Sequence, residues 1–321
     1  MALLEIRSLC VDFEGARRIC AVDHVDLSVE RESCVAIVGE SGSGKSQLLL
    51  ACTGLLAANG RASGSVRFDG LELLGAGEPA TRIRGSGIGF VFQDASGSLT
   101  PHRRIGEQLA ETAVAARGVT RQAALVEAER MLERVRLPEA RRHLAEYPHE
   151  LSGGMRQRVA IAAALIPQPR LLFADEPTTA LDVTVQAEII DLLADLCREL
   201  GMAMLLVTHD LGVVAGLADR IAVMYAGRIV ESAEAARLLA GPAHPYSAGL
   251  LAAVPRLDDP PGSELRTIAG APPRPGTILP GCRFEPRCGY AQARCRGEDP
   301  PLVMRGAAGI ACHYPLNQGE R

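Results

Sequence analysis

The chain has 321 residues, of which 47% are hydrophobic, and a net charge of −4 from 34 basic and 38 acidic side chains. This hydrophobic content is enough for a full core and excludes an intrinsically disordered chain. The acidic balance, the 3% aromatic content and the lack of tryptophan argue against a nucleic-acid-binding protein, which needs a basic face and stacking rings. The length predicts two domains, or one large domain with an appendage.

The chain carries no pattern of a segment that enters a membrane. Its first residues, Met1 to Arg7, reach charged side chains at once and do not form a signal peptide. The longest apolar run, Val159 to Ile166, is far shorter than the roughly 18 residues that a spanning helix needs. We therefore expect a soluble, cytoplasmic chain, so that any membrane work would need other chains to span the bilayer.

Strand patterns dominate the first part of the chain. Alternating apolar residues predict strands over 4–13 and 21–29, and the short apolar run over 34–38 predicts a buried parallel strand. Residues 47–52 look helical, and 63–70 predict a strand that closes on an Asp-Gly turn.

Between the buried strand and the helix lies the segment Gly39-Glu40-Ser41-Gly42-Ser43-Gly44-Lys45-Ser46, which fits G-x-x-x-x-G-K-[ST] at every fixed position. Such a loop cradles a phosphate with backbone N–H groups at a helix N-terminus. Lys45 would reach the β- and γ-phosphates, and Ser46 would offer its hydroxyl to Mg²⁺. A flexible Gly/Ser turn with a chance lysine is disfavoured, because strand, loop and helix occur in the required order. The residues expected to bind ATP here are Gly39, Gly42, Ser43, Gly44, Lys45, Ser46 and Gln47.

Downstream, buried strands alternate with helices. The expected elements are a strand over 87–93, helices within 103–142, a strand over 170–175, a helix over 187–193, a strand over 204–208 and a hairpin over 221–231 that turns at Ala226-Gly227. This alternation predicts an α/β fold with a mainly parallel sheet, N-terminal antiparallel strands and a helical subdomain inserted at about residues 94–160. After residue 241, prolines mark a loop-rich appendage.

The strand over 170–175 ends in two acids, Asp175 and Glu176. At the edge of a sheet that also carries a phosphate loop, Asp175 would hold Mg²⁺ and Glu176 would act as general base toward the attacking water. A solvated acidic strand end is the alternative, and the upstream phosphate loop disfavours it.

Between these motifs lies Leu151-Ser152-Gly153-Gly154-Met155-Arg156-Gln157-Arg158. With them it resembles the LSGGxxQR signature of the ATP-binding subunits of ABC transporters. The resemblance implies that Gln93 contacts Mg²⁺ and reports to membrane subunits, and that Ala180-Leu181-Asp182 crosses a dimer interface. It also implies that His209 touches the γ-phosphate. In this family the surface Ser152, Gly153 and Gly154 faces the phosphate loop of another subunit.

Two further positions follow from the same resemblance. Phe13 would stack on adenine, although a plain strand-core phenylalanine fits the sequence as well. Gln47 replaces the Thr or Val common in the family, a change that we expect to leave activity intact. Because the chain has one copy of each motif, the resemblance implies that it pairs with itself or with a relative.

The resemblance is most specific to oligopeptide/dipeptide importers. Phe92-Gln93-Asp94 with Ser98-Leu99-Thr100-Pro101 resembles the FQDP…SLNP segment of that branch, although Ala95 and Thr100 depart from it, and residues 244–251 also fit. This implies an ATPase domain over 1–240 and a peptide-transporter-type extension over 241–321. The implied partners are a second ATPase subunit, two transmembrane permease subunits and a substrate-binding protein. The chain would then lie peripherally at the cytoplasmic face of the inner membrane. Nickel, opine or sugar as cargo stays open, as does a soluble ABC ATPase without membrane partners.

The tail contains Cys282, Cys288, Cys295 and Cys312 in a C-x5-C-x6-C-x16-C spacing. This resembles a C-terminal cysteine motif that holds an iron–sulfur cluster in some family members, and four thiolates suit a 4Fe–4S cluster. A C-x2-C pair, typical of zinc ribbons, is missing. We expect a structural cluster, and zinc or no metal remain the alternatives.

Overall fold

The structure, a computed structural model of the chain, describes residues 2–75, 77, 81, 83–84, 86–179, 181–254, 267–274, 276–277 and 279–316. The chain divides into two compact units, each described by itself. The helical unit comprises Met1–Leu3, Val29–Ser33 and Asp69–Leu206. The phosphate-loop unit comprises Leu4–Ser28, Cys34–Phe68 and Val207–Arg321.

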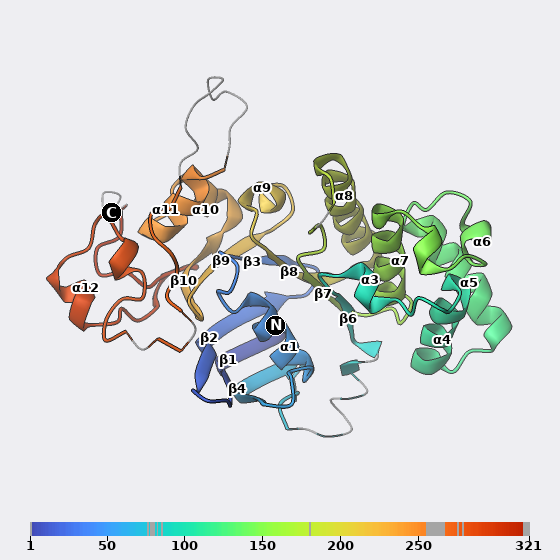
Figure 1. Cartoon of the computed structure of the whole chain (residues 1–321), viewed down its shortest axis with the longest axis horizontal. Helices are drawn as coiled ribbons and strands as arrows, with labels where there is room; N and C mark the ends of the chain where they lie inside the picture. The colour runs from blue at the N-terminus through green and yellow to red at the C-terminus, as the bar shows by residue number, and fades with distance from the viewer. Residues whose placement is uncertain are drawn as a thin grey trace. The chain divides into compact units, whose positions relative to one another are not determined.

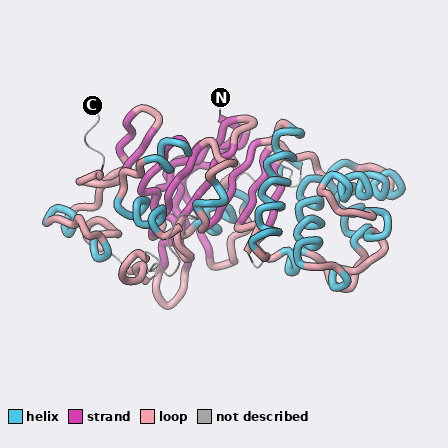
Figure 2. Tube along the Cα trace, turned by 90° about the horizontal axis from the view of Figure 1, so that it is seen from above, coloured by secondary structure: helices cyan, strands magenta, loops and turns pink. Residues whose placement is uncertain are grey.

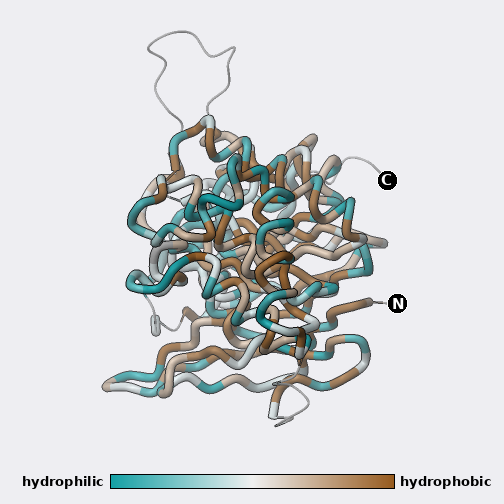
Figure 3. Tube along the Cα trace, turned by 90° about the vertical axis from the view of Figure 1, so that its right-hand side faces the viewer, coloured by the Kyte–Doolittle hydropathy of each residue, from teal (hydrophilic) through white to brown (hydrophobic). Residues whose placement is uncertain are grey.

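The phosphate-loop unit contains two sets of strands (Figure 1). The first set, in the order β2-β1-β4, consists of β1 (Ala2–Phe13), β2 (Ile19–Glu30) and β4 (Gly60–Phe68). The antiparallel pairing of β1 with β4 confirms the predicted N-terminal strands. Buried and exposed residues alternate along β2 from Val25 to Glu30, and Figure 3 shows hydrophobic and hydrophilic residues interspersed along the chain. Period-2 alternation is what a sheet with one buried face requires.

The second set has the order β11-β12-β10-β9-β3. Its members are β3 (Cys34–Val38), β9 (Arg220–Tyr225), β10 (Arg228–Glu234), β11 (Val303–Arg305) and β12 (Ala308–Ile310). The β3–β9 pair is parallel, whereas the other neighbouring pairs are antiparallel. The predicted hairpin at Ala226-Gly227 is confirmed, since both residues have positive φ.

The helices of this unit are α1 (Lys45–Thr53), α9 (Leu211–Val214), α10 (Ala235–Ala240), α11 (Pro245–Ala252) and α12 (Ala293–Gly297), with a 3-10 turn over Glu285–Arg287. The extension is loop-rich, as expected, and it also adds β11 and β12 to the edge strand β10, with Glu231 opposite Ile310. Residues 255–266, 275, 278 and 317–321 of the extension lie outside the described residues.

In the helical unit, strands β6 (Ile88–Val91) and β7 (Leu171–Asp175) pair in parallel, and the chain forms a group of helices between them in sequence. These helices are α3 (Ala95–Ser98), α4 (Ile105–Arg117), α5 (Arg121–Arg134), α6 (Ala140–His143) and α7 (Gly153–Leu165), with a 3-10 turn over Pro148–Glu150. Figure 1 and Figure 2 show them as one group, as the predicted helical insertion requires. The remaining elements are β5 (Leu71–Glu72), α8 (Val183–Leu200) and β8 (Ala203–Thr208).

Burial accounts for the apolar runs and stripes in the sequence. Every residue of β3, β7 and β8 is buried, as expected for strands covered on both faces. α8 instead buries one stripe, including Ile189, Leu193 and Leu196. In the described parts of the chain, we find no helix with both the length and the apolar character to cross a membrane.

Candidate functional site

The phosphate loop follows directly from the buried strand β3. A side chain at Gly39 is impossible here, because its Cβ would lie 2.1 Å from the carbonyl oxygen of Met224. Gly44 has φ 104°, and its Cβ would lie 2.3 Å from the carbonyl oxygen of Ala21. Close packing and left-handed backbone therefore explain the glycines that the motif requires.

Lys45 closes the loop from inside. Its buried ammonium donates hydrogen bonds to the carbonyl oxygens of Gly39 (2.8 Å) and Glu40 (2.9 Å). Lys45 is also the first residue of α1, with Ser46 and Gln47 in the same turn. Loop N–H groups, helix terminus and ammonium therefore converge, which is the arrangement that binds polyphosphate.

Two further candidate binding residues are Ser43, within the loop, and Phe13. The Ser43 hydroxyl is buried and has no hydrogen-bond partner within the described structure, which leaves it available to an incoming oxygen. Phe13, half-buried at the end of β1, packs so closely on Gly60 that a Cβ there would lie 2.9 Å from its ring. This contact is compatible with both readings of Phe13, so its role toward adenine stays a prediction.

In the helical unit, a hydrogen bond connects Gln93 with Glu176, the residue that follows β7, although the two are 83 positions apart in the sequence. The amide Nε2 of Gln93 donates to Glu176 Oε2 (3.2 Å), and the Thr179 hydroxyl donates to the same oxygen (2.9 Å). Asp175 beside them is buried, at 6% exposure. Glu176 has φ 45°, a left-handed conformation that is uncommon for a non-glycine residue and often marks a functional site. Sequence reasoning missed Thr179, whose only signal was its place just after Glu176.

The predicted interface residues occupy the N-termini of α7 and α8. Ser152 caps α7 by accepting the N–H of Met155 (3.3 Å), and Asp182 caps α8 by accepting the N–H of Val185 (3.0 Å). Gly154 lies so near α8 that a Cβ there would be 2.9 Å from Val185 Cγ1, whereas at Gly153 the closest atom would be 3.6 Å away. Both helix starts therefore have local structural roles. Ala180, which precedes Leu181 and Asp182 in the predicted interface segment, lies outside the described residues.

His209 lies directly after β8 in the phosphate-loop unit, and its side chain is exposed. The next residue, Asp210, caps α9 by accepting the N–H of Gly212 (2.7 Å). The predicted site residues thus divide between the units. The phosphate-loop unit holds residues 39–47, Phe13 and His209, and the helical unit holds Gln93, Asp175, Glu176, Ser152, Gly153, Gly154 and Asp182.

The four tail cysteines, each 17 or fewer positions from the next along the chain, line one small pocket together. His244, Phe284 and Tyr290 are among its other walls. Burial raises the pKa of Cys282 to about 11, and it also raises the pKa of Cys288 and Cys312. Four sulfurs that line one pocket are the donor set that a 4Fe–4S cluster would need. No three of these sulfurs, all of which belong to the described part of the chain, lie within 4.8 Å of one another, the spacing that a single-ion site would show.

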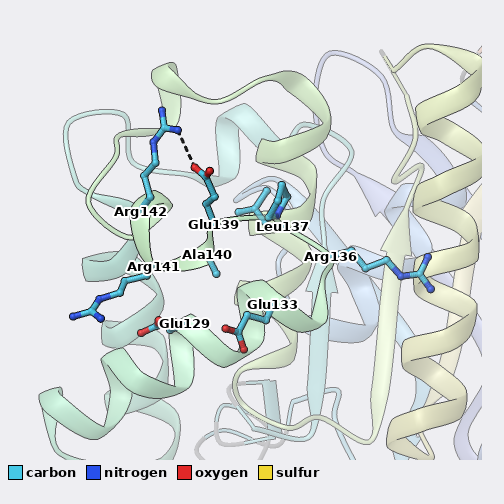
Figure 4. A pocket seen from close by; sticks show the side chains of 9 residues that line it. Glu129, Glu133, Arg136, Leu137, Glu139, Ala140, Arg141 and Arg142 are labelled. Atoms are coloured by element: carbon cyan, nitrogen blue, oxygen red, sulfur yellow. Dashed lines mark hydrogen bonds and ion pairs between the residues drawn. The ribbon is translucent and has the colours of Figure 1, made fainter.

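A larger pocket of about 860 Å³ lies by α5 and α6 and contains none of the predicted site residues (Figure 4). Its wall carries both signs of charge, including Glu129, Glu133 and Arg141. Arg142 pairs with Glu139 (2.9 Å), and Arg136 reaches Asp195 of α8 (2.5 Å). This mixed surface offers no convergent phosphate-binding groups.

Sequence reasoning also missed two residues that hold the phosphate loop from the extension, Tyr246 and Arg287. Both contact Glu40, from 206 and 247 positions away in the chain. No local pattern announces such contacts, because only the folded sheet brings these segments together.

Comparisons with known proteins agree with the motifs. Residues 22–179 match the ABC transporter family, and residues 230–295 match the oligopeptide/dipeptide transporter C-terminal region. The chain is 47% identical over 318 residues to the oligopeptide transport ATP-binding protein OppD of Salmonella typhimurium, which covers 98% of this chain and 95% of the relative. It is 48% identical over 318 residues to a putative peptide import ATP-binding protein of Brucella melitensis, with 94% and 93% covered.

A solved dimeric structure of the ATP-binding cassette MJ0796, in a post-hydrolysis state bound to ADP and Pi, is similar to this chain with a TM-score of 0.65. The two are 31% identical, over 72% of this chain and 98% of that chain. This similarity confirms the predicted α/β cassette fold.

Proposed function

This chain belongs to the ABC transporter family, and on that premise we propose that it is the energy-coupling ATPase subunit of an importer for di- and oligopeptides. The observation that carries the proposal is its full-length similarity to oligopeptide transport ATP-binding proteins, extension included. ATP hydrolysis is the activity of this family, and the phosphate loop is intact in sequence and geometry.

In the proposed site the phosphate loop binds the triphosphate. Loop N–H groups and the start of α1 hold the phosphate oxygens, and Lys45 turns its ammonium from the loop carbonyls toward the β- and γ-phosphates. Ser46, Gln93 and Asp175 offer a hydroxyl, an amide and a carboxylate. Such hard oxygen donors suit Mg²⁺, which neutralises phosphate charge when bound.

Glu176 is proposed as the general base that takes a proton from the attacking water. Gln93 and Thr179 both donate to one of its carboxylate oxygens. These two bonds fix the direction of the carboxylate. His209 is proposed to contact the γ-phosphate.

The site is proposed to be composite. Ser152, Gly153 and Gly154 would present the N-terminus of α7 to nucleotide held by another subunit, and Asp182 would lie at the same interface. The dimeric state of the similar cassette MJ0796 supports this arrangement. A second ATPase subunit, two permease subunits and a substrate-binding protein are the proposed partners, with this chain bound peripherally at the cytoplasmic face of the inner membrane. The division into an ATPase domain over 1–240 and an extension over 241–321 is part of the same proposal.

Cys282, Cys288, Cys295 and Cys312 are proposed to hold a 4Fe–4S cluster, because all four line one pocket. When bound, the cluster would act as a cross-link within a segment that has little core of its own. The chain's own part is to supply four sulfurs, of which that of Cys295 is buried and the other three are half-buried, and to exclude water with the buried Phe284.

The test is co-expression with candidate permease and second ATPase subunits of a peptide importer, followed by reconstitution in vesicles. We expect the chain to co-purify with the membrane subunits and its ATPase rate to rise with a peptide-loaded binding protein. Hydrolysis that responds to nickel, opine or sugar instead would change the cargo assignment, and a chain that co-purifies with no membrane subunit would refute the importer assignment.

A further inference from the structure

The carboxylate of Glu40, inside the phosphate loop, is held by a side chain from the cysteine segment. Arg287 Nη1 donates to Glu40 Oε2 (2.7 Å), and Nη2 donates to Oε1 (2.9 Å), a two-pronged ion pair. The Arg287 side chain is only 4% exposed, so solvent screens this pair little.

The guanidinium is fully committed to this position. Its Nε donates to the carbonyl oxygen of Ala269 (2.9 Å), and Nη2 also reaches the carbonyl oxygen of Ile268 (3.3 Å). Its Cζ atom lies 5.8 Å from the ring centre of Tyr225 and 6.0 Å from that of Phe284. A side chain with so many partners has one conformation, and the loop residue that it binds shares that rigidity.

The backbone of Glu40 is held from the same side. Its N–H donates to the hydroxyl of Tyr246 (2.9 Å), and the Tyr246 ring packs against Tyr225 and Phe284. The carbonyl oxygen of Glu40 accepts from Lys45 (2.9 Å). One loop residue therefore links the extension to the lysine that the proposed function assigns to the phosphates.

The charges of Glu40 and Arg287 give their ion pair a function in ligand binding. Glu40 is an anion placed in a loop whose ligand is a polyphosphate, and an unpaired carboxylate there would repel that ligand. Arg287 neutralises it and fixes the orientation of its carboxylate through two hydrogen bonds. We propose that Arg287 is a positioning residue of the nucleotide site, through which the cysteine segment sets the affinity of the chain for ATP. This proposal rests on the proposed function of the phosphate loop.

The test uses the full-length chain and measures ATP affinity and steady-state hydrolysis. Arg287→Met should raise the dissociation constant and KM for ATP about 10-fold and leave kcat within about 2-fold, because the chemistry at Glu176 is untouched. Adding Glu40→Gln to Arg287→Met removes the uncompensated charge and should restore affinity to within about 3-fold of the wild type. A purely structural arginine would gain nothing from losing its partner.

Arg283→Met is the matched control. Arg283 comes from the same segment, is also largely buried, and pairs with Asp23 and the carbonyl oxygen of Ala226, outside the phosphate loop. Its loss should leave ATP affinity unchanged. If Arg287→Met does not fold, Arg287→Gln keeps hydrogen-bonding groups without the charge, and the same comparison with Glu40→Gln applies.

The proposal is overturned if Arg287 variants bind ATP like the wild type, if Arg283→Met weakens binding equally, or if Glu40→Gln brings no recovery. A wild-type chain that does not bind ATP would instead refute the proposed function itself, so the two failures are distinct.

Discussion

At the scale of single residues, hydrogen bonds from neighbouring groups hold both Lys45 and Glu176. Lys45 is bound by two loop carbonyls, and Glu176 by Gln93 and Thr179. Glu176 is already oriented by its bonds, whereas Lys45 would exchange its loop carbonyls for phosphate oxygens. Substitutions here should therefore act on defined steps of the ATPase cycle.

Lys45→Ala removes a charged donor to the phosphates and the two bonds that shape the loop. We expect the affinity for ATP to fall about 10- to 100-fold, the range for lost charge-assisted hydrogen bonds. Titration with a fluorescent ATP analogue measures it. Unchanged affinity would contradict the assignment of residues 39–46 as the phosphate loop.

Glu176→Gln keeps the size of the side chain and one acceptor oxygen for Gln93 and Thr179, but it removes the basic carboxylate. ATP binding should persist, and turnover should fall by about 10²- to 10⁴-fold, as for the loss of a general base. Phosphate release under saturating ATP is the measurement. A variant that hydrolyses ATP at the normal rate would show that another group takes the proton.

At the scale of elements, the starts of α7 and α8 serve folding as well as the proposed interface. Ser152 and Asp182 are helix caps, each worth about 1 kcal/mol in typical proteins. Gly154 permits the close approach of α7 to Val185. These residues therefore serve both the folding of the helix starts and the proposed interface, and comparing stability with ATPase activity separates the two roles.

Gly154→Ala should destabilise the chain by about 1 to 3 kcal/mol, because the new methyl group overlaps Val185. Gly153→Ala is the matched variant: its methyl group has ordinary contact distance, and alanine favours a helix by up to about 1 kcal/mol. We expect Gly153→Ala to fold at least as well as the wild type and still lose ATPase activity if it faces a partner's nucleotide. Urea midpoints and phosphate release give the two readouts; a fully active Gly153→Ala would count against that interface.

At the scale of the whole molecule, the extension is tied to the rest of the phosphate-loop unit in several ways. β12 pairs with β10, Tyr246 and Arg287 reach Glu40, and Arg283 and Arg228 share Asp23. The cysteine pocket lies within this network, since Phe284 lines it and packs against Tyr225. Loss of a metal group should therefore be felt beyond the pocket.

Cys288→Ser should lower the iron and acid-labile sulfide content of anaerobically purified protein from about four of each per chain. It should also expose the extension to limited proteolysis, because the pocket loses its cross-link. Cys20→Ser, an exposed thiol outside the extension, is the control and should change neither. Wild-type protein with zinc or without metal, or an unchanged iron content in Cys288→Ser, would refute the cluster and leave the ATPase assignment intact.

The sequence alone determined the fold class and the chemistry. Strand β3, the loop over 39–46 and α1 follow one another along the chain, so strand burial, glycine requirements and helix start are local properties that a pattern reports. The same holds for the acidic end of β7 and for the start of α7. Motif order then identified the family, which the comparisons confirmed.

Only the tertiary structure decided which distant residues meet. The pairing of Gln93 with Glu176, the collection of four cysteines around one pocket and the hold of Arg287 on Glu40 each join segments separated in the chain. β11 and β12 escaped detection because three-residue strands such as Ala308-Gly309-Ile310 have no period to read, and they form by adding to the open edge of β10. These contacts are non-local, and their free energy depends on burial and geometry that exist only once the sheet has formed.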